Sequence, residues 1–498
     1  MREFSQTLSE FTKGLRPDAN TPRNSGFATE LYNSRCGVAG LEVPPLIVYP
    51  ISGTPAVSWP LPQLIKIKDI TTGGTDLIFL SSTNPQYAYK VNADYSITAI
   101  CTGSGTDPIN LSTPGPYTVA DFGWYQLFHK LAMPTNILER YFNSDDGAWY
   151  WRKYSGGGEL PTYANITCIC NFRGRLIAGL LTATSGTDGT KGYAVVWSRI
   201  GTVDRSMMLK ASGDHIDRDA TADYNYMRTS GNYRIGPNSV IHRILPLGNG
   251  VMVYCSDRIF YMKQVVSPEP TFGIVSVAGF GIPSTFAVAG DEDEHCFVDS
   301  YKNLWKVQAG QKPKYLGYRE FITTLGTIVM SKNSNLDDYY ISDGVKTYLL
   351  SPYGLSQWFQ YPTSLVWEDA NKRLIGPIAV AADVTAYMAS DTLDFGTRGI
   401  KTIMSMEIGS SGQTPTANVD YKYKVTDSAF TSSAFKTASP AGTVSPIVSG
   451  VELRVRVKGA DYTKFDLDYV NVRYKYVDKR IVRGAYATDA KVLSRTGR

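Results

Sequence analysis

The sequence has little of the chemistry that most enzymes and metal proteins use. Its 498 residues include six cysteines and four histidines, and charged residues make up 19% of the chain. The cysteines lack any CxxC or Cys/His zinc spacing, so we predict reduced thiols, with Cys168 and Cys170 as buried apolar residues, and neither a metal nor a cofactor. His129 and His242 stand in apolar runs, where packing is favoured over catalysis. No GxSxG, HExxH or Walker motif is present.

Long apolar runs and helical patterns are also missing. No segment reaches the about 18 apolar residues of a membrane span. The N-terminal sequence MREFSQTLSEFTKGLRP lacks the apolar core, at least about seven residues long, of a signal peptide. We therefore expect neither a membrane span nor a leader. No interval combines a 3.6-residue period with helix caps, so a mainly helical fold is excluded.

β-Forming residues are abundant. The chain has 33 Tyr and 19 Phe among many Thr, Val and Ile, and 45 Gly and 26 Pro punctuate them. Aromatic and β-branched residues favour strands, and Gly and Pro favour the turns between them. The composition predicts an all-β protein.

A hairpin pattern recurs along the chain as an apolar run, a turn of Ser, Asp, Asn or Gly, and a second apolar run. The steps between copies are 48, 51, 76, 45, 43 and 40 residues, and all but one match the roughly 40 to 50 residues of a four-stranded propeller blade. The long step contains the polar, Gly- and Asp-rich interval 201–236, which we predict to be an inserted loop. The repeat predicts a six- to seven-bladed β-propeller, with a hairpin-built β-sandwich as the alternative. The anchors of the copies are Leu77, Tyr125, Leu176, Met252, Phe297, Tyr340 and Val380.

Three parts are predicted: an N-terminal arm over residues 1–45, the β-propeller over 46–398 and a C-terminal β-rich domain over 399–498. The arm is rich in turn residues, and we expect it to pack on the propeller, donate a closing strand or reach a neighbouring subunit. The C-terminal strands alternate cleanly between apolar and polar residues. They favour an antiparallel β-sandwich-like extension, or a last blade with a long extension.

Positive charge is concentrated in the C-terminal segment. Residues 451–498 contain 12 Lys/Arg and 6 Asp/Glu, a net of +6, while the whole chain carries +5, so the preceding residues carry −1. The strands GVELRVRVKG and YVNVRYKYVDKR, which we expect to be neighbours, would present these charges opposite an apolar face. Contact with DNA phosphates or an acidic subunit is one interpretation, and a charged edge that resists aggregation is the other. The candidate contact residues are Arg454, Arg456, Lys458, Arg473, Lys475, Lys479, Arg480 and Arg483.

Two acidic clusters, GDHIDRDATAD and GDEDEH, are weaker candidates. Neither has the ligand spacing and central Gly of a calcium loop, so we predict solvated loops. The Ser/Asp/Gly/Trp motif of sialidase blades is not matched either. A glycosidase needs two facing carboxylates, which a propeller can carry without any local motif. A pair of glycosidase carboxylates without a recognisable motif therefore remains a minor alternative.

Several sequence segments together resemble those of one family of virion proteins. Between about Phe11 and Gly484 the chain contains GLRPDANTPRNSGFATELYNSRCGVAGLEVP, CNFRGRLIAGL, VVWSRIGTVD, LPLGNGVMVYCSDRIF, CFVDSYKNLWKV and YVNVRYKYVDKRIVRG. These segments are similar to those of the β-propeller tail proteins of short-tailed bacteriophages, called tail nozzle or packaged-DNA stabilisation proteins.

The resemblance implies a structural protein of the virion tail, made in the cytoplasm of a bacterial host. Its partners would be further copies of itself in a ring, usually six, with tail adaptor or portal-vertex proteins and tail fibre or needle proteins. Packaged double-stranded DNA would be held in the bore and conducted through it at ejection. No catalytic residues come with the resemblance, so we predict that the chain is not an enzyme. The alternatives are a distal tail propeller that binds a host receptor or glycan and, less favoured, a glycan-cleaving enzyme.

Overall fold

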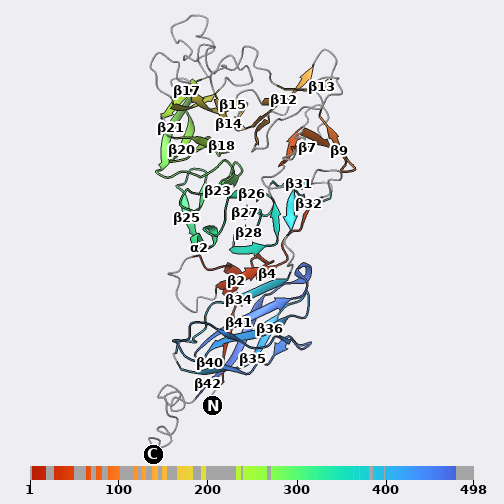
Figure 1. The fold of residues 1–498 in the computed structure, drawn as a ribbon, viewed down its shortest axis with the longest axis vertical. Helices are drawn as coiled ribbons and strands as arrows, with labels where there is room; N and C mark the ends of the chain where they lie inside the picture. The colour runs from red at the N-terminus through yellow and green to blue at the C-terminus, as the bar shows by residue number, and fades with distance from the viewer. Residues whose placement is uncertain are drawn as a thin grey trace, which may run out of the picture.

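The computed structural model confirms an all-β chain (Figure 1). The helices in its described part are the 3₁₀ turns η1 (Glu10–Lys13) and η3 (Tyr462–Lys464) and the four-residue α2 (Arg319–Ile322). None of these is long or apolar enough to cross a membrane. The structure describes residues 3–17, 27–49, 63–68, 75–80, 88–100, 117–121, 125–130, 137–143, 148–153, 165–182, 192–197, 231–236, 239–265, 271–362, 364–368, 371–380, 385–397 and 399–477.

Six antiparallel units of four strands follow one another in these ranges, and within each unit the strands neighbour in chain order. Short hairpin connections produce such meanders because a tight turn joins only antiparallel strands. The units are β6–β9 (Gln63–Lys68, Thr75–Leu80, Ala88–Val91, Ile97–Ala99), β10–β13 (Tyr117–Asp121, Tyr125–Lys130, Ile137–Asn143, Ala148–Lys153), β14–β17 (Asn165–Phe172, Arg175–Thr182, Gly192–Trp197, Gly231–Gly236), β18–β21 (Ile241–Leu247, Gly250–Cys255, Ile259–Val265, Thr271–Ala278), β22–β25 (Val288–Gly290, Glu294–Val298, Leu304–Gln308, Lys314–Gly317) and β26–β29 (Val329–Asn333, Asp338–Ser342, Thr347–Leu350, Leu355–Trp358).

The hairpin repeat read from the sequence corresponds to these units. Its first six anchors fall on the second strands of the successive units, β7, β11, β15, β19, β23 and β27. β19, the second strand of the fourth unit, is buried at all six positions, as expected for an apolar strand that is covered on both faces. The long step lies within the third unit, between β16 and β17. The inserted loop was predicted to extend to residue 236, and this is wrong because residues 231–236 form β17 and pair with β16. Residues 201–230 lie outside the described part.

A further group of short strands follows the sixth unit. It contains β30 (Gln360–Pro362) paired with β33 (Ile378–Val380), and β31 (Val366–Glu368) paired with β32 (Arg373–Ile375). The seventh anchor, Val380, ends β33. Strand β31 contacts β6 of the first unit, and the first strands β6, β10, β14 and β18 contact one another in that order. The first strands of successive units therefore lie against one another.

The C-terminal module is a sandwich of two sheets, seen at the bottom of Figure 1. Ile403 and Met406 from one sheet and Val455 and Val457 from the other belong to the same buried cluster. Alternation along each strand directs these apolar side chains inward and the polar ones outward. One sheet contains β1 (Glu3–Leu8), β42 (Tyr469–Tyr476), β35 (Lys401–Gly409), β39 (Thr443–Val444) and β40 (Val448–Gly450), and the other contains β2 (Ala28–Tyr32), β34 (Ala386–Ser390), β41 (Glu452–Gly459), β36 (Thr416–Lys422), β37 (Thr431–Ser432) and β38 (Lys436–Thr437).

The six four-stranded units and the group of short strands form the other module. The N-terminal segment is shared between this module and the C-terminal sandwich. β1 is an edge strand of one sandwich sheet, whereas β2 lies between β29 of the sixth unit and β34 of the other sandwich sheet. The segment continues through the hairpin β3–β4 (Arg35–Cys36, Leu41–Glu42) to β5 (Ile47–Val48), which pairs in parallel with β32. In Figure 1, β2 and β4 lie at the junction of the two modules. One ten-stranded sheet thus runs from the sixth unit into the sandwich.

Candidate functional site

The predicted basic residues do not form one face. Strands β41 and β42, expected to be neighbours, belong to opposite sheets of the sandwich. Because Val455 of β41 and Val472 of β42 both point into the shared core, the alternate basic residues point to opposite outer surfaces. Alternation along each strand was predictable, but it does not say which strands pair. Arg454, Arg456 and Lys458 lie on β41, Arg473 and Lys475 lie on β42, and Lys479, Arg480 and Arg483 lie outside the described residues.

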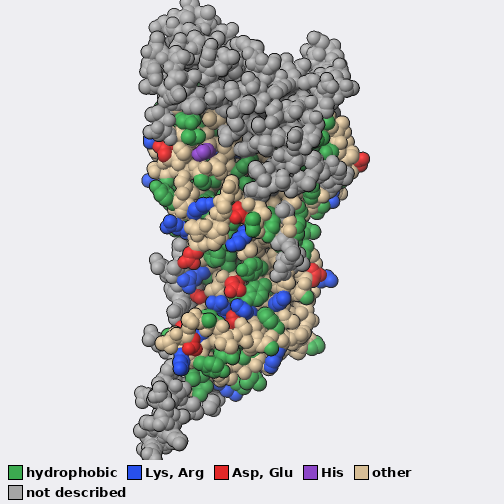
Figure 2. All heavy atoms as spheres, in the orientation of Figure 1, with side chains coloured by type: hydrophobic (Ala, Val, Ile, Leu, Met, Phe, Trp, Pro, Cys, Tyr) green, Lys and Arg blue, Asp and Glu red, His purple; other side chains and the backbone are tan. Residues whose placement is uncertain are grey.

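Acidic partners offset much of the positive charge on β41. Arg456 Nε is 2.7 Å from Asp420 Oδ2, and its Nη2 is 3.8 Å from Glu30 Oε1. Arg454 Nη1 is 3.7 Å from the same Glu30 oxygen, and its guanidinium lies 4.6 Å from the centre of the Phe430 ring. On the face shown in Figure 2, basic and acidic side chains are interspersed over the lower part of the molecule. Compensation of this kind weakens a field that could attract phosphates.

Arg473, on the opposite surface, is less constrained. Its Nη2 is 3.9 Å from Glu407 Oε2, and the Arg473 side chain is 54% exposed. Lys458 of β41 is also exposed. An exposed pair at this distance contributes at most about 1 kcal/mol to stability. Of the five predicted residues in the described chain, these two have the side chains most available for an external contact.

An open cavity of about 340 Å³ lies at the junction of the modules, and we call it the junction cavity. It forms where β2 runs between β29 and β34, so strands from both modules and the N-terminal segment contribute to it. Tyr32 and Tyr387 face each other across the β2–β34 pair, with ring centres 6.0 Å apart. The cavity is lined by Tyr32, Asn33, Gln357, Trp358, Phe359, Tyr361, Thr385, Tyr387, Phe435, Arg456 and Lys458.

The junction cavity combines aromatic surface, side-chain amides and positive charge. Burial raises the pKa of Tyr387, and the charge of the nearby Glu30 carboxylate and a hydrogen bond to it add to the rise, so the phenol stays protonated. The Arg456 guanidinium lies 5.6 Å from the Tyr387 ring centre, within reach of a cation–π contact. Aromatic faces with a few fixed polar groups are typical of ligand sites. Sequence reasoning found Arg456 and Lys458 here but missed the aromatic residues, which come from distant segments.

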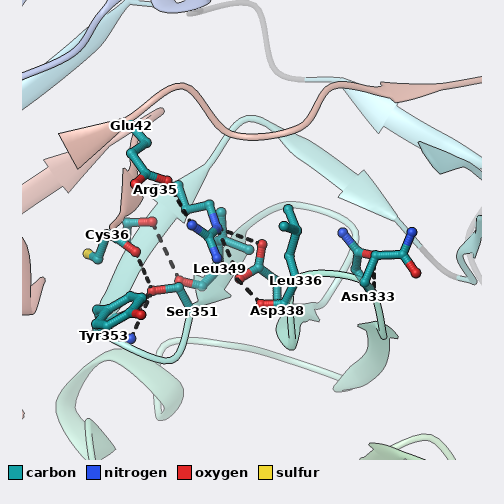
Figure 3. Close-up of polar contacts among 12 residues, drawn as sticks. Arg35, Cys36, Glu42, Asn333, Leu336, Asp338, Leu349, Ser351 and Tyr353 are labelled. Carbon is teal, nitrogen blue, oxygen red and sulfur yellow. Dashed lines mark hydrogen bonds and ion pairs between the residues drawn. The ribbon is translucent and has the colours of Figure 1, made fainter. Parts of the chain in front are cut away.

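Arg35 forms a buried ionic network that holds the N-terminal hairpin against the sixth unit (Figure 3). Its Nε donates to both carboxylate oxygens of Asp338, at 3.1 and 2.9 Å, and its Nη1 donates to Glu42 Oε2 at 2.8 Å. Nearby, Ser351 Oγ donates to the carbonyl oxygen of Cys36 at 2.7 Å. Asp338 has no exposed surface, and burial raises its pKa although Arg35 acts to lower it. Sequence reasoning missed this network because its members are about 300 residues apart.

The acidic cluster GDEDEH is only partly the solvated loop that we predicted, because Glu292 and Asp293 are exposed but Asp291 and Glu294 are paired with lysines. Lys332 Nζ lies 2.5 Å from Asp291 Oδ2, and Lys306 Nζ lies 2.7 Å from Glu294 Oε2. Burial acts to raise the pKa of both carboxyl groups, but their lysine partners lower it below the usual range. These acids therefore join β23 to β24 and to the sixth unit. The other cluster, GDHIDRDATAD, lies outside the described residues.

His295 and the described cysteines are packing residues. His295 is fully buried, with Nε2 donating to Pro246 O and Nδ1 accepting from Tyr254 Oη, both at 2.8 Å. Burial lowers its pKa to about 4, which keeps the ring neutral. Cys168 and Cys170 are buried free thiols, as predicted. Within the described ranges, no group of three or more His, Cys, Asp or Glu is arranged to hold a metal ion.

Comparison with known proteins finds structural similarity at low sequence identity. No protein-family model matches the chain, and no curated protein matches it. It is similar to an exo-beta-1,3-galactanase from Phanerochaete chrysosporium, with 8% identity, a TM-score of 0.28, and coverage of 75% of this chain and 98% of that one. It is also similar to the SapL1 lectin in complex with alpha methyl fucoside, with 10% identity, a TM-score of 0.31, and coverage of 60% and 96%.

These comparisons correct one prediction from the sequence. We predicted that the chain is not an enzyme, whereas the structures similar to it include glycoside hydrolases such as the galactanase. That prediction is therefore contradicted, and we do not retain it. Identities of 8% and 10% with TM-scores of 0.28 and 0.31 assign neither a reaction nor a substrate to this chain.

Proposed function

We propose that this chain is a structural component of a bacteriophage tail that assembles as a ring below the portal or adaptor, retains packaged DNA and conducts it during ejection. The observation that carries the proposal is the path of the N-terminal segment. It adds β1 to one sandwich sheet, places β2 between the modules and fixes the β3–β4 hairpin through Arg35 and Asp338. A segment that joins two modules by sheet hydrogen bonds and a buried ion pair suits a rigid building block.

The resemblance to tail nozzle proteins supports the same proposal. The segment GLRPDANTPRNSGFATELYNSRCGVAGLEVP is one of the segments that carry this resemblance. It contains β2, β3 and β4 together with Arg35 and Glu42. One of the segments that carry the resemblance therefore contains the strands that join the modules. With this role we propose a β-propeller of six or seven blades, supported by the six four-stranded units and the contact between β31 and β6.

The partners of the proposed ring are further copies of the chain, portal-side adaptor proteins, fibre or needle proteins, and DNA in the bore. Arg454 and Arg456 are engaged by Glu30 and Asp420 within the chain, so they support an external contact less than Arg473 does. We propose Arg473, together with Lys458 on the other surface, as the described residues that meet a subunit or DNA phosphates.

Composition of the virion tests the proposal. Mass spectrometry of purified particles should detect the chain in multiple copies, and the purified protein should form a ring with its portal-side neighbour. Doubly substituted R473Q/K458Q protein should still assemble but alter genome retention or ejection. A chain that is absent from particles and stays monomeric beside that neighbour would refute a tail role.

A second candidate function is recognition of a host-surface glycan at the junction cavity. It is favoured by the aromatic lining of that cavity and by Lys458, whose exposed ammonium group suits a sugar ring that carries an acidic group. Binding of the purified chain to host polysaccharide should then weaken at least tenfold in Tyr387→Ala. The matched control is Tyr301→Ala, since Tyr301 is 67% exposed and does not line the cavity. Equal binding by both variants would exclude this site.

A further inference from the structure

A cavity of about 300 Å³ lies along the outer strand of the fourth unit, and we call it the edge cavity. Met252 of β19, Tyr261 of β20 and Val275 of β21 are opposite one another in the sheet. Met252 is buried whereas Val275 is 62% exposed, so this row of side chains runs from the floor of the cavity to its rim. The turn between β24 and β25 of the fifth unit supplies the remaining wall. The described lining residues are Leu247, Met252, Tyr261, Val275, Ser276, Val277, Gly310, Gln311 and Lys312.

The lining of the edge cavity is mainly apolar and carries one positive charge. The Tyr261 ring is held in place by its Oη, which donates to Leu247 O at 3.2 Å. Lys312 is exposed and is the one charged residue among the described lining residues. Glu292 and Asp293 contact this region through their carbonyl oxygens, and neither lines the cavity. An apolar group with a negative charge beside it therefore matches this lining.

β21 differs from the outer strands of the other five units. β9 has only three residues, β13, β17 and β25 contain Lys or Arg, and β29 is covered by β2. β21 has eight residues, TFGIVSVA, without a charge or a proline, and within the described ranges it pairs only with β20. In Figure 1 it lies at the left side of its module. Short length, charge, proline and a covering segment are the features that keep an outer strand from pairing with another chain, and β21 has none of them.

The sixth unit shows how such a strand can be covered. There β2 adds in parallel to β29, with Tyr32 opposite Gln357. An unpaired strand edge presents a row of N–H and C=O groups, and an extended segment satisfies them by adding a further strand. The pairing of β21 with β20 is regular from Thr271 to Ser276, which leaves a regular edge for such an addition. Because β1 and β2 of the N-terminal segment are already paired within the chain, the occupant that fits β21 is a segment of another protein.

We propose that β21 and the edge cavity form a docking site for an extended segment of another protein, which adds a strand to β21. One aliphatic side chain of that segment enters the cavity. An acidic side chain two residues away, on the same face of the added strand, meets Lys312. Backbone hydrogen bonds supply affinity, and the two side chains supply specificity. The proposal depends neither on the tail role nor on glycan binding at the junction cavity.

Binding of short peptides to the full chain tests the proposal. Fluorescently labelled peptides of the form TVTXTZTV place X and Z on one face of a strand, and fluorescence anisotropy measures their affinity. We expect the peptide with Leu at X and Asp at Z to bind. Ser at X should weaken binding at least about tenfold, because the apolar contact in the cavity is lost. Lys at Z should also weaken binding, because it repels Lys312.

N-methylated peptides test whether the segment adds as a strand. Along a strand, the N–H groups of alternate residues point to opposite edges. Methylation of the odd residues therefore blocks one edge, and methylation of the even residues blocks the other. One of the two peptides should bind like the unmethylated one, and the other should bind at least about tenfold more weakly.

Two variants of the chain locate the site. Val275→Lys places a charge on the exposed rim, so it should abolish peptide binding without changing the melting temperature. The matched control is Val345→Lys, since Val345 is 70% exposed and does not line the cavity. Lys312→Glu should reverse the preference at Z from Asp to Lys, which a merely structural role of Lys312 would not do.

Several outcomes would overturn the proposal. They are no peptide binding at about millimolar concentration, equal loss in both methylated peptides, undiminished binding to V275K, and an unchanged preference for Asp in K312E. Sedimentation of the full chain tests the other occupant, a second copy. Self-association that V275K abolishes and V345K preserves would assign the edge to that copy and contradict docking of a different protein.

Discussion

Replacing Arg35 with Met tests whether the buried ion pair holds the N-terminal hairpin to the sixth unit. The Arg35 side chain is 9% exposed and that of Asp338 is 0% exposed, so the substitution leaves a buried carboxylate without its charge partner. Breaking one side of a buried pair typically costs about 3–5 kcal/mol. We expect a loss of that size in the free energy of unfolding at pH 8, measured by urea denaturation with tryptophan fluorescence.

The pH dependence of the R35M deficit gives an independent check. Burial already raises the pKa of Asp338, and loss of Arg35 raises it further. A carboxyl group whose pKa is higher in the folded than in the unfolded state weakens the fold as pH rises from its unfolded value of about 3.9 through its folded value. The deficit should therefore be smaller at pH 5 than at pH 8. The double variant R35M/D338N should recover part of it, because no charge is left unpaired.

Arg258→Met is the matched control for this experiment. Arg258 pairs with Asp257 at 2.8 Å, but the two side chains are 47% and 37% exposed. A pair at this exposure contributes at most about 1 kcal/mol. If R35M loses less than about 1 kcal/mol, or no more than R258M, the network in Figure 3 does not anchor the segment.

Three further predictions concern the same fold. Phe11→Ala removes a fully buried ring and should cost about 3–5 kcal/mol in urea unfolding; a loss under 1 kcal/mol would contradict its place in the core. Gly14→Ala should lower the melting temperature, because Gly14 has a φ of 79° and an added Cβ would lie 2.5 Å from Leu355 O; an unchanged value would argue against the contact with β29. Wild-type stability should fall by up to about 3 kcal/mol between pH 6.5 and about 4, since unfolded His295 binds a proton before the folded residue does. A His295→Gln variant with the same pH profile would refute that assignment.

The repeat and the strand faces were predictable from the sequence because they depend on local patterns. Leu77 and Met252 were placed on the second strands of successive units from hairpin spacing alone. Val455 and Val457 were assigned to an inward face from alternation, and both are buried. These features need only the period of two and the turn chemistry between strands.

Pairing between distant strands was not predictable. β1 pairs with β42 from the opposite end of the chain, and β2 lies between β29 and β34. Many alternating strands fit one another equally well, so the sequence did not reveal that β41 and β42 belong to opposite sheets. The Arg35–Asp338 pair was missed for the same reason.

The central claim is the location of the chain in a phage particle, and electron cryomicroscopy of virions that carry a tagged copy tests it directly. We predict density for the tag in a ring around the tail axis, below the portal and adaptor. We also predict that the two modules dock into that ring as one rigid body. A tag found at a distal tip, at a single peripheral site or nowhere on the particle would contradict the account.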